Sequence, residues 1–272
     1  MPELPDVEIF RRLAERISAG RTIEEVGVPD PGMVRGSSAA GAAGDVRRRL
    51  ETKRVGACRR HGKVLFIETE HGGALALHFG TNGSLRHVAK GEAEPASVRL
   101  WLGFAEGDRL AYLNPRRIGE VRLAESAASF IAEAGLGPDA LDPALDVAAF
   151  SAALGEGRQG IKAILMDQAR IAGIGNIYSD EILFQARVHP ALPGRALDAA
   201  ARARLYAAMR HVLGTAIARG AGAENFTENL PKDFLIPERH AGGHCPRCGA
   251  ALRVYKQGGR TGYYCPRCQE EP

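Results

Sequence analysis

Four cysteines near the carboxyl end of the chain constrain its fold more than any other feature. Cys245 and Cys248 form one C-x-x-C knuckle, Cys265 and Cys268 form a second, and sixteen residues separate the two. This spacing is typical of one zinc ion bound tetrahedrally by four thiolates, with the intervening residues folded as a hairpin. Four cysteine ligands leave no open coordination position, so the predicted zinc ion is structural. A disulfide is the weaker alternative, because nothing else in the chain is typical of a secreted protein.

The predicted zinc hairpin is positively charged. No Asp or Glu occurs from residue 239 to residue 268. The hairpin and its knuckles contain Arg247, Arg253, Lys256, Arg260 and Arg267. Charge of a single sign favours a polyanionic partner, most simply nucleic acid. The alternative from this segment alone is a zinc ribbon that binds a partner protein or merely ends the chain.

Length and composition set wider bounds. The 272 residues, of which 45% are hydrophobic, suffice for one large or two medium domains. The net charge is only +4, so an anion-binding surface must come from clustered residues. No apolar run is long enough to cross a membrane, and the amino terminus is not a signal peptide. We therefore expect a cytoplasmic protein, nucleoid-associated if bacterial, in which Cys58 is a small core residue.

The spacing of apolar residues predicts the organisation of the chain. A period of 3.6 predicts a helix over residues 6–20, and a period of two predicts eight short strands between residues 22 and 124. Such strands favour a β-sandwich or barrel. Residues 135–138 are interpreted as a linker, and the Gly/Ala-rich residues 36–44 and the polar residues 220–243 as loops. The helices expected after the strands span residues 146–154, 161–167, 176–186 and 197–219.

The amino terminus offers a nucleophile. Removal of Met1 would leave Pro2 with a free secondary amine, which can attack a carbon and form an iminium. An α-amino group has a reference pKa of about 7.7–8.0. The positive end of the following helix disfavours the protonated amine, and Glu3 lies beside it to move protons. The alternative, favoured by this segment alone, is a frayed terminus with an incidental proline.

Three further segments contain candidate binding residues. Residues 173–176, Gly-Ile-Gly-Asn, open a predicted helix, where backbone N–H groups and the Asn176 amide would bind an anion. The alternative is that these glycines only let two helices approach closely. Lys63, at the start of an apolar strand, and Arg116 with Arg117, in a turn, are suited to phosphate contacts. Their alternatives are a solvated strand edge and an ordinary hairpin end.

Taken together and in order, these segments resemble the formamidopyrimidine-DNA glycosylase / endonuclease VIII family of base-excision repair enzymes. The resemblance implies an α+β fold with three parts. An N-terminal β-sandwich catalytic domain with an N-terminal helix would span residues 1–126, a helical helix–two-turn–helix domain residues 138–220, and a four-cysteine zinc finger residues 238–272. The resemblance is carried by PELPDVE (residues 2–8), HGK (61–63), HFGTNGSLR (78–86), NPRRIG (114–119), residues 161–184 and the zinc hairpin.

The resemblance also implies a bifunctional glycosylase and lyase that removes oxidised or ring-opened bases from damaged double-stranded DNA, acting as a monomer with one zinc ion. Pro2 would attack C1′ of a flipped nucleoside, Glu3 would act in base release and sugar opening, and Lys63 would hold backbone or lesion groups. β- and δ-elimination would then cut the strand. Arg260, grouped with these catalytic residues, would hold a phosphate. The DNA-binding residues that it implies are Arg116, Arg117, Asn176, Lys162 and His78.

The chain departs from the family pattern at the positions that fill the void left by the flipped base. The formamidopyrimidine branch has Met, Arg and Phe, whereas Thr81, Arg116 and Ile118 stand here. Residues 222–227 read GAENFT in place of a Gly-Gly-Thr-Thr-like stretch, and Asp6 replaces the commoner Glu. We therefore expect oxidised pyrimidines, ring-opened purines or abasic sites to be preferred over 8-oxoguanine. The competing hypotheses are a non-catalytic or lesion-altered DNA-binding protein and a zinc-stabilised protein adaptor.

Overall fold

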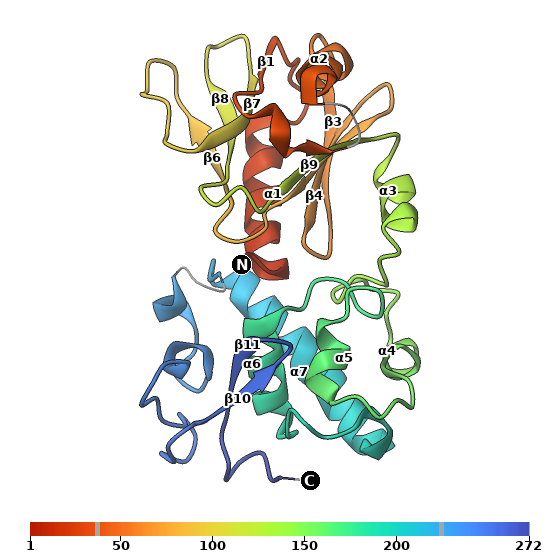
Figure 1. The fold of residues 1–272 in the computed structure, drawn as a ribbon, viewed down its shortest axis with the longest axis vertical. Coiled ribbons are helices and arrows are strands. Elements are labelled where there is room, and N and C mark those ends of the chain that lie inside the picture. The colour runs from red at the N-terminus through yellow and green to blue at the C-terminus, as the bar shows by residue number, and fades with distance from the viewer. Residues whose placement is uncertain (36–38, 223–225, 272) are drawn as a thin grey trace. The chain divides into compact units, whose positions relative to one another are not determined.

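The computed structural model describes residues 1–35, 39–222 and 226–271 (Figure 1). These residues form two compact units. One comprises residues 1–2 and 7–135, and the other comprises residues 3–6 together with those from 136 onward. The division falls within the linker that the glycines predict. Within the described ranges, no helix has both the length and the apolar character that a membrane span requires.

The helices and strands keep the labels of Figure 1. Up to residue 135 they are α1 (Leu4–Ser18), β1 (Glu25–Gly27), η1 (Pro31–Met33), β2 (Val34–Arg35), α2 (Ala39–Leu50), β3 (Val55–His61), β4 (Val64–Thr69), β5 (Ala74–His78), β6 (Ser84–Val88), β7 (Val98–Gly103), β8 (Arg109–Leu113), β9 (Glu120–Ala124) and α3 (Ala127–Glu133). Beyond it they are α4 (Val147–Leu154), α5 (Ile161–Met166), α6 (Asn176–Ala186), η2 (Gly194–Ala196), α7 (Ala199–Ala218), η3 (Thr227–Asn229), η4 (Ile236–Glu238), β10 (Arg253–Gln257) and β11 (Arg260–Tyr264).

Two β-sheets build the first unit. Their strand orders are β1-β7-β8-β6 and β2-β9-β5-β4-β3, and β2 pairs with β9 in parallel. Leu65 and Ile67 of β4 point into one apolar core together with Leu100 of β7, as the period of two predicts. Between them Phe66 faces the opposite side and packs edge-on against Phe130 of α3. The predicted sandwich is therefore confirmed, and α3 packs on the outer face of its larger sheet at Phe66.

The Gly/Ala-rich stretch corrects one expectation. Residues 36–44 were interpreted as a loop, but α2 begins at Ala39. Alanine is the best helix former, and Val46 and Leu50 bury the apolar face of this helix in the core of the first unit. Residues 36–38 lie outside the described residues. Composition rich in small residues is therefore compatible with a helix wherever two apolar side chains anchor one face.

The second unit has a helical core with a β-hairpin beside it. Helices α4 to α7 share one apolar cluster, and α5 and α6, joined by residues 167–175, form the predicted helix–two-turn–helix element. Strands β10 and β11 pair antiparallel, with Gln257 opposite Arg260. Gly258 and Gly259 between them both have positive φ, which a two-residue hairpin turn requires. The hairpin contacts α6 through β11.

Candidate active site and zinc centre

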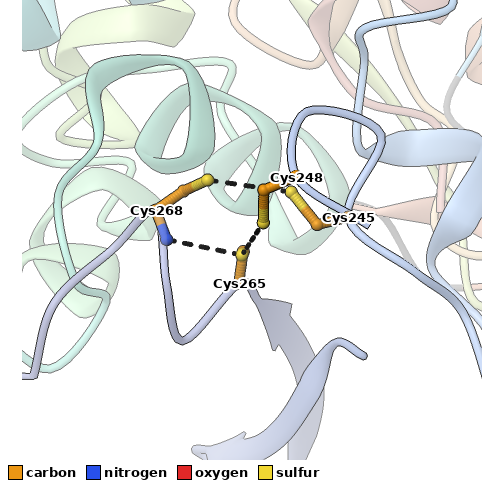
Figure 2. Close-up of side chains that lie close together, drawn as sticks. All are labelled: Cys245, Cys248, Cys265 and Cys268. Atoms are coloured by element: carbon orange, nitrogen blue, oxygen red, sulfur yellow. Dashed lines mark hydrogen bonds between the residues drawn. The ribbon is translucent and has the colours of Figure 1, made fainter. Parts of the chain in front are cut away.

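The two cysteine knuckles meet as the spacing predicts (Figure 2). The four sulfur atoms lie within 4.8 Å of one another. The Sγ atoms of Cys245 and Cys268 are 3.8 Å apart, and those of Cys248 and Cys265 are 3.5 Å apart. Zn–S bonds of about 2.3 Å in a tetrahedron place sulfurs about 3.8 Å apart, so the cluster fits one zinc ion. With four thiolates and no open position, this zinc is structural.

Glu3 forms a buried polar site in the second unit. Its side chain is 2% exposed, and its carboxylate lies at the amino end of α6. Oε2 accepts hydrogen bonds from the backbone N–H groups of Gly175 (2.7 Å) and Tyr178 (3.2 Å), and Oε1 accepts one from Ile177 (2.8 Å). The first turn of a helix has unpaired N–H groups and a positive dipole end, so it stabilises a negative charge there. Among the described residues, Glu3 is therefore bound by backbone donors and not by a cationic side chain.

Glycines make room for this contact. A Cβ on Gly175 would lie 2.4 Å from the Glu3 carboxyl carbon, and a Cβ on Gly173 would lie 2.5 Å from a methyl group of Leu4. Gly173 also has φ of 118°, which strongly favours glycine. Both alternatives raised by the sequence hold in part, because the Asn176 amide donates to the carbonyl of Thr261 and not to the anion. The turn binds an anion, which is Glu3 of the same chain, and the glycines permit close approach.

The backbone around Glu3 is fixed as well. The N–H of Glu3 donates to Oδ2 of Asp6 (2.8 Å), and the N–H of Leu4 donates to the carbonyl of Gly173 (3.1 Å). Asp6 is the third residue of α1, where a carboxylate commonly caps the residue before the helix. Aspartate thus performs this capping contact in place of the commoner glutamate. The residue that follows Pro2 is consequently anchored through both its backbone and its side chain.

Asp180, one turn further along α6, is bound quite differently. It is 1% exposed, and Lys162 donates to its Oδ1 (2.5 Å). Its Oδ2 accepts from Nη2 of Arg239 (2.8 Å) and from the backbone N–H of Tyr263 (3.0 Å). The hydroxyl of Tyr255 lies 3.4 Å from Oδ1. This cluster joins α5, α6, the segment before the zinc finger and both hairpin strands.

Lys162 requires a correction. It was expected to contact DNA, but its side chain is fully buried and its ammonium contacts Asp180 and the carbonyl of Asn176 (3.1 Å). Burial lowers the pKa of Lys162, and the charge of Asp180 opposes that shift. A buried ammonium saturated by internal acceptors has no surface for a phosphate. Lys162 therefore supports the fold around Asn176.

Asn176 and Arg260 are the residues of the second unit expected to bind phosphate. A hydrogen bond from Asn176 to the neighbour of Arg260 links them. Asn176 donates from Nδ2 to the carbonyl of Thr261 in β11 (2.9 Å), and its Oδ1 is buried without a hydrogen-bond partner in the described structure. Thr261 is adjacent to Arg260, which is exposed at the hairpin turn. Across residues 1–35, 39–222 and 226–271, no hydrogen bond or ion pair engages the Arg260 guanidinium. It remains available to an external anion.

In the first unit, Asn114 organises the two segments expected to probe DNA, residues 78–86 and 114–119. Its side chain is fully buried. Nδ2 donates to the carbonyl of Phe79 (2.8 Å), and Oδ1 accepts from the backbone N–H of Ile118 (3.1 Å). One amide therefore fixes both segments with respect to each other. Sequence reasoning did not single out Asn114, although an asparagine before a proline is a common turn signal.

The two arginines in residues 114–119 have different surroundings. Arg117 has φ of 54°, and its guanidinium pairs with both carboxylate oxygens of Asp30 (2.8 and 2.9 Å). Arg116 is exposed and, in the described part of the chain, forms no ion pair or hydrogen bond. Ile118 is 52% exposed, whereas Thr81 is half-buried. Arg116 and Ile118 are thus the exposed side chains at the tip of this segment, beside the paired Arg117.

Lys63 lies in the two-residue turn between β3 and β4, not at the start of a strand. His61 pairs with Val64 across this turn, and Gly62 has φ of 55°. His78, at the end of β5, pairs with the same valine, so it lies close to Lys63. Burial lowers the pKa of His78, and the positive charge of Lys63 lowers it further. Both effects favour the neutral form of the His78 imidazole. Cys58 is buried in the core, and burial raises its pKa to about 12, so it is no nucleophile.

Three family models match successive parts of the chain. The formamidopyrimidine-DNA glycosylase N-terminal domain matches residues 1–121, the formamidopyrimidine-DNA glycosylase H2TH domain residues 136–228, and the zinc finger found in FPG and IleRS residues 242–270. The last match covers all four cysteines. It supports the zinc assignment that their geometry gives.

Whole-length relatives agree with these matches. The formamidopyrimidine-DNA glycosylases of Thermomicrobium roseum and Acidothermus cellulolyticus are each 36% identical, covering 99% and 100% of this chain and 99% and 98% of their own. A Lactococcus lactis FPG mutant, solved in complex with Fapy-dG-containing DNA, superposes with a TM-score of 0.87 at 27% identity, over 99% of this chain and all of that one. A MutM structure in complex with carbocyclic 8-oxo-G-containing DNA also has a TM-score of 0.87, at 26% identity and the same coverage. The chain therefore belongs to the formamidopyrimidine-DNA glycosylase family.

Proposed function

We propose that this DNA glycosylase of base-excision repair uses the secondary amine of Pro2, exposed by removal of Met1, as both glycosylase nucleophile and lyase catalyst. The observation that carries this proposal is the anchoring of Glu3. Its carboxylate, its N–H and the N–H of Leu4 are all hydrogen-bonded, so the residue that precedes Glu3 starts from a fixed backbone. A nucleophile must be held in a near-attack geometry to act efficiently. A proline that only ended the chain would need no such support.

The chemistry follows from a secondary amine beside a carboxylate. The nitrogen lone pair of Pro2 bonds to C1′ as the glycosidic bond breaks, and the base departs with the bonding electrons and takes a proton from water. Transfer of the amine proton to the ring oxygen O4′ opens the sugar ring and leaves an iminium cation. Oε1 of Glu3 accepts one hydrogen bond, so it keeps a lone pair with which to carry a proton. Its negative charge also stabilises the neighbouring cation.

The iminium then makes strand cleavage possible. It acidifies the C2′ hydrogens, so loss of one of them expels the 3′ phosphate by β-elimination. A second elimination expels the 5′ phosphate. We assign to Lys63 the positioning of backbone or lesion groups, because it lies in the hairpin turn between β3 and β4, in the same unit as the two segments expected to probe DNA.

Damaged duplex DNA is the proposed partner. The solved relatives named above contain DNA with damaged bases, and this chain presents exposed Arg116, Ile118 and Arg260. A base must leave the stack before C1′ can be attacked, at a cost of a few kcal/mol. An arginine and an apolar side chain that enter the vacated space offset that cost. Arg117 is paired with Asp30, so only its remaining N–H groups are available to the DNA. The monomeric state and the cytoplasmic location stay predictions.

Lesion preference is part of the proposal. Thr81 is half-buried and short, and Ile118 is aliphatic, so neither stacks or wedges as the usual methionine and phenylalanine do. We expect oxidised pyrimidines, ring-opened purines or abasic sites to be processed faster than 8-oxoguanine. A panel of duplexes that differ only in the lesion tests this. Fastest single-turnover release of 8-oxoguanine opposite cytosine would overturn the preference while leaving the chemistry intact.

The nucleophile is tested by borohydride trapping on DNA with one abasic site, followed by mass mapping of the cross-linked peptide. We expect the adduct on Pro2. The matched variant Lys63→Ala should still be trapped, because its proline amine is unchanged. An adduct that maps to Lys63 and disappears in this variant would contradict the assignment. Absence of any adduct, together with normal binding, would favour the non-catalytic DNA-binding alternative.

A further inference from the structure

A basic pocket lies in the second unit, beside the zinc knuckles. Its volume is about 520 Å³, within the usual range for ligand pockets. Four arginines line it, two from the knuckles and two from the helical part: Arg247, Arg267, Arg187 and Arg204. The two C-P-R-C knuckles therefore direct their arginines into one shared site. None of these residues belongs to the catalytic or DNA-probing segments.

These arginines are available for an external anion. Arg187, Arg204 and Arg267 are exposed, and none has an ion pair or side-chain hydrogen bond within the described residues. Arg247 is the fixed member of the set. Its guanidinium donates to the side chain of Gln185 (3.0 Å) and lies 4.4 Å over the ring of Phe184. A held guanidinium loses little further entropy when it binds a carboxylate.

The floor of the pocket is aliphatic. Val188 and Leu197 are buried there, and Leu192 is half-buried. The one ring in the lining, His189, already packs edge-to-face against Tyr264 with centroids 4.6 Å apart. Single-stranded nucleic acid is bound by stacking bases on exposed aromatic side chains. An aliphatic floor under an arginine rim instead suits an apolar side chain flanked by carboxylates.

The charge of the pocket also favours a short ligand. Zinc with four thiolates carries about two negative charges, and Glu270 at the rim adds one more. The four arginines outweigh these by only about one unit, which is enough for a few carboxylates but weak for a polyanion. The chain's own Glu271 is engaged elsewhere, because it pairs with Arg253 (2.7 Å). Glu271 is therefore not available to fill this pocket.

We propose that this pocket docks an acidic peptide segment of a partner protein, with one aliphatic side chain on the floor and flanking carboxylates on the arginines. Arginine forks bind carboxylates bidentately, which gives direction as well as attraction. Such a contact would recruit the enzyme to another protein without competing for its DNA-binding residues. The surface is independent of the proposed nucleophile.

The test is fluorescence anisotropy with a labelled peptide that has a central leucine between aspartates, using the full-length zinc-loaded protein. We expect saturable binding below about 1 mM that weakens with salt. The double variant Arg187→Asn/Arg204→Glu should weaken binding at least tenfold. Asparagine is chosen because position 187 has φ of 56°, which asparagine tolerates. The control Arg158→Glu reverses an exposed arginine outside the pocket and should change affinity less than twofold.

Two further arms decide the nature of the ligand. Replacing the peptide's leucine with serine should weaken binding severalfold if the aliphatic floor is used. Single-stranded DNA should not displace the peptide. Equal affinity of the double variant, no saturable binding, an indifferent leucine, or displacement by the oligonucleotide would each overturn the proposal. We expect the double variant to keep the native glycosylase activity. Failure of the peptide-binding proposal would therefore leave the catalytic assignment unaffected.

Discussion

The amino end and the middle of α6 each bind a buried carboxylate, by opposite means. Glu3 is bound by three backbone N–H groups of the helix, and Asp180 by the side chains of Lys162 and Arg239. Backbone donors bring no net charge, so Glu3 keeps its negative charge for a neighbouring cation. Asp180 is instead paired with the side chains of Lys162 and Arg239, which offset its charge. The first arrangement suits chemistry, and the second suits fixing the zinc hairpin to the helix.

A third carboxylate follows directly in the sequence. Glu181 is fully buried, and its two oxygens accept from Gln185 (2.8 Å) and from the backbone N–H of Ile236 (2.8 Å). No cation of the described ranges pairs with it. Burial raises its pKa to about 8. Adjacent acidic residues on one helix thus have different surroundings, because Asp180 faces cations and Glu181 faces neutral donors.

The largest effect is expected from Glu3→Gln. The amide keeps the size of the side chain but loses its charge and one acceptor, so base release should slow by about 10²–10⁴-fold. Loss of the helix cap should cost only about 1–2 kcal/mol of stability. Single-turnover kinetics and urea denaturation measure the two quantities. Glu3→Asp, which keeps the charge on a shorter arm, should fall between. A native rate in Glu3→Gln would reduce Glu3 to a helix cap.

Asp180→Asn should have the opposite balance of effects, with a large loss of stability and a small change in the rate of base release. Lys162 and Arg239 would be left without a buried anion, which costs about 3–5 kcal/mol when one partner of a buried pair is removed. We expect a lower urea midpoint and weaker zinc retention, since the backbone of Tyr263 in β11 loses its charged acceptor. Adding Lys162→Met to this variant should restore part of the stability. If the single variant is as stable as the native protein, the ionic cluster does not fix the hairpin.

The contrast also explains what the sequence could and could not predict. Strand alternation and the cysteine spacing are local signals, so the sandwich and the zinc hairpin are predictable from them. The anion site at Gly173–Asn176 is likewise a local signal, but its ligand comes from Glu3, which local patterns cannot connect to α6. Lys162 shows the same limit. A single lysine among Ile161, Ile164 and Leu165 gives no sign that it is buried until Asp180 is placed beside it.

Glu181, the third carboxylate, should make the stability of the protein depend on pH, and this effect is smaller than the two above. The folded-state pKa of Glu181, about 8, lies above its ordinary value, so the folded protein holds a proton that the unfolded chain releases. Its contribution to stability is complete below about pH 4.5 and is lost as the pH rises to about 8. Glu181→Gln, which imitates the protonated form, should remove this decline. We expect the variant to match the native protein at pH 5 and to be more stable at pH 8 in urea denaturation. Parallel stability curves would mean that Glu181 is ionised in the folded state.

The smallest effect is expected from Arg260→Ala. This variant tests whether Arg260, on the hairpin that Asp180 helps to fix, binds DNA. Arg260 is exposed at the hairpin turn, so its removal should leave folding and zinc content unchanged. If it contacts one phosphate, the slope of log affinity against log salt should become shallower by about one unit, with a severalfold loss of affinity. Titrations of abasic-site duplex at several salt concentrations measure this slope. Arg253→Ala, on the same hairpin but paired with Glu271, is the matched control. An equal change in both variants would indicate a diffuse charge effect. A specific phosphate contact depends on the position of the arginine, whereas a diffuse effect depends only on the number of arginines in the hairpin.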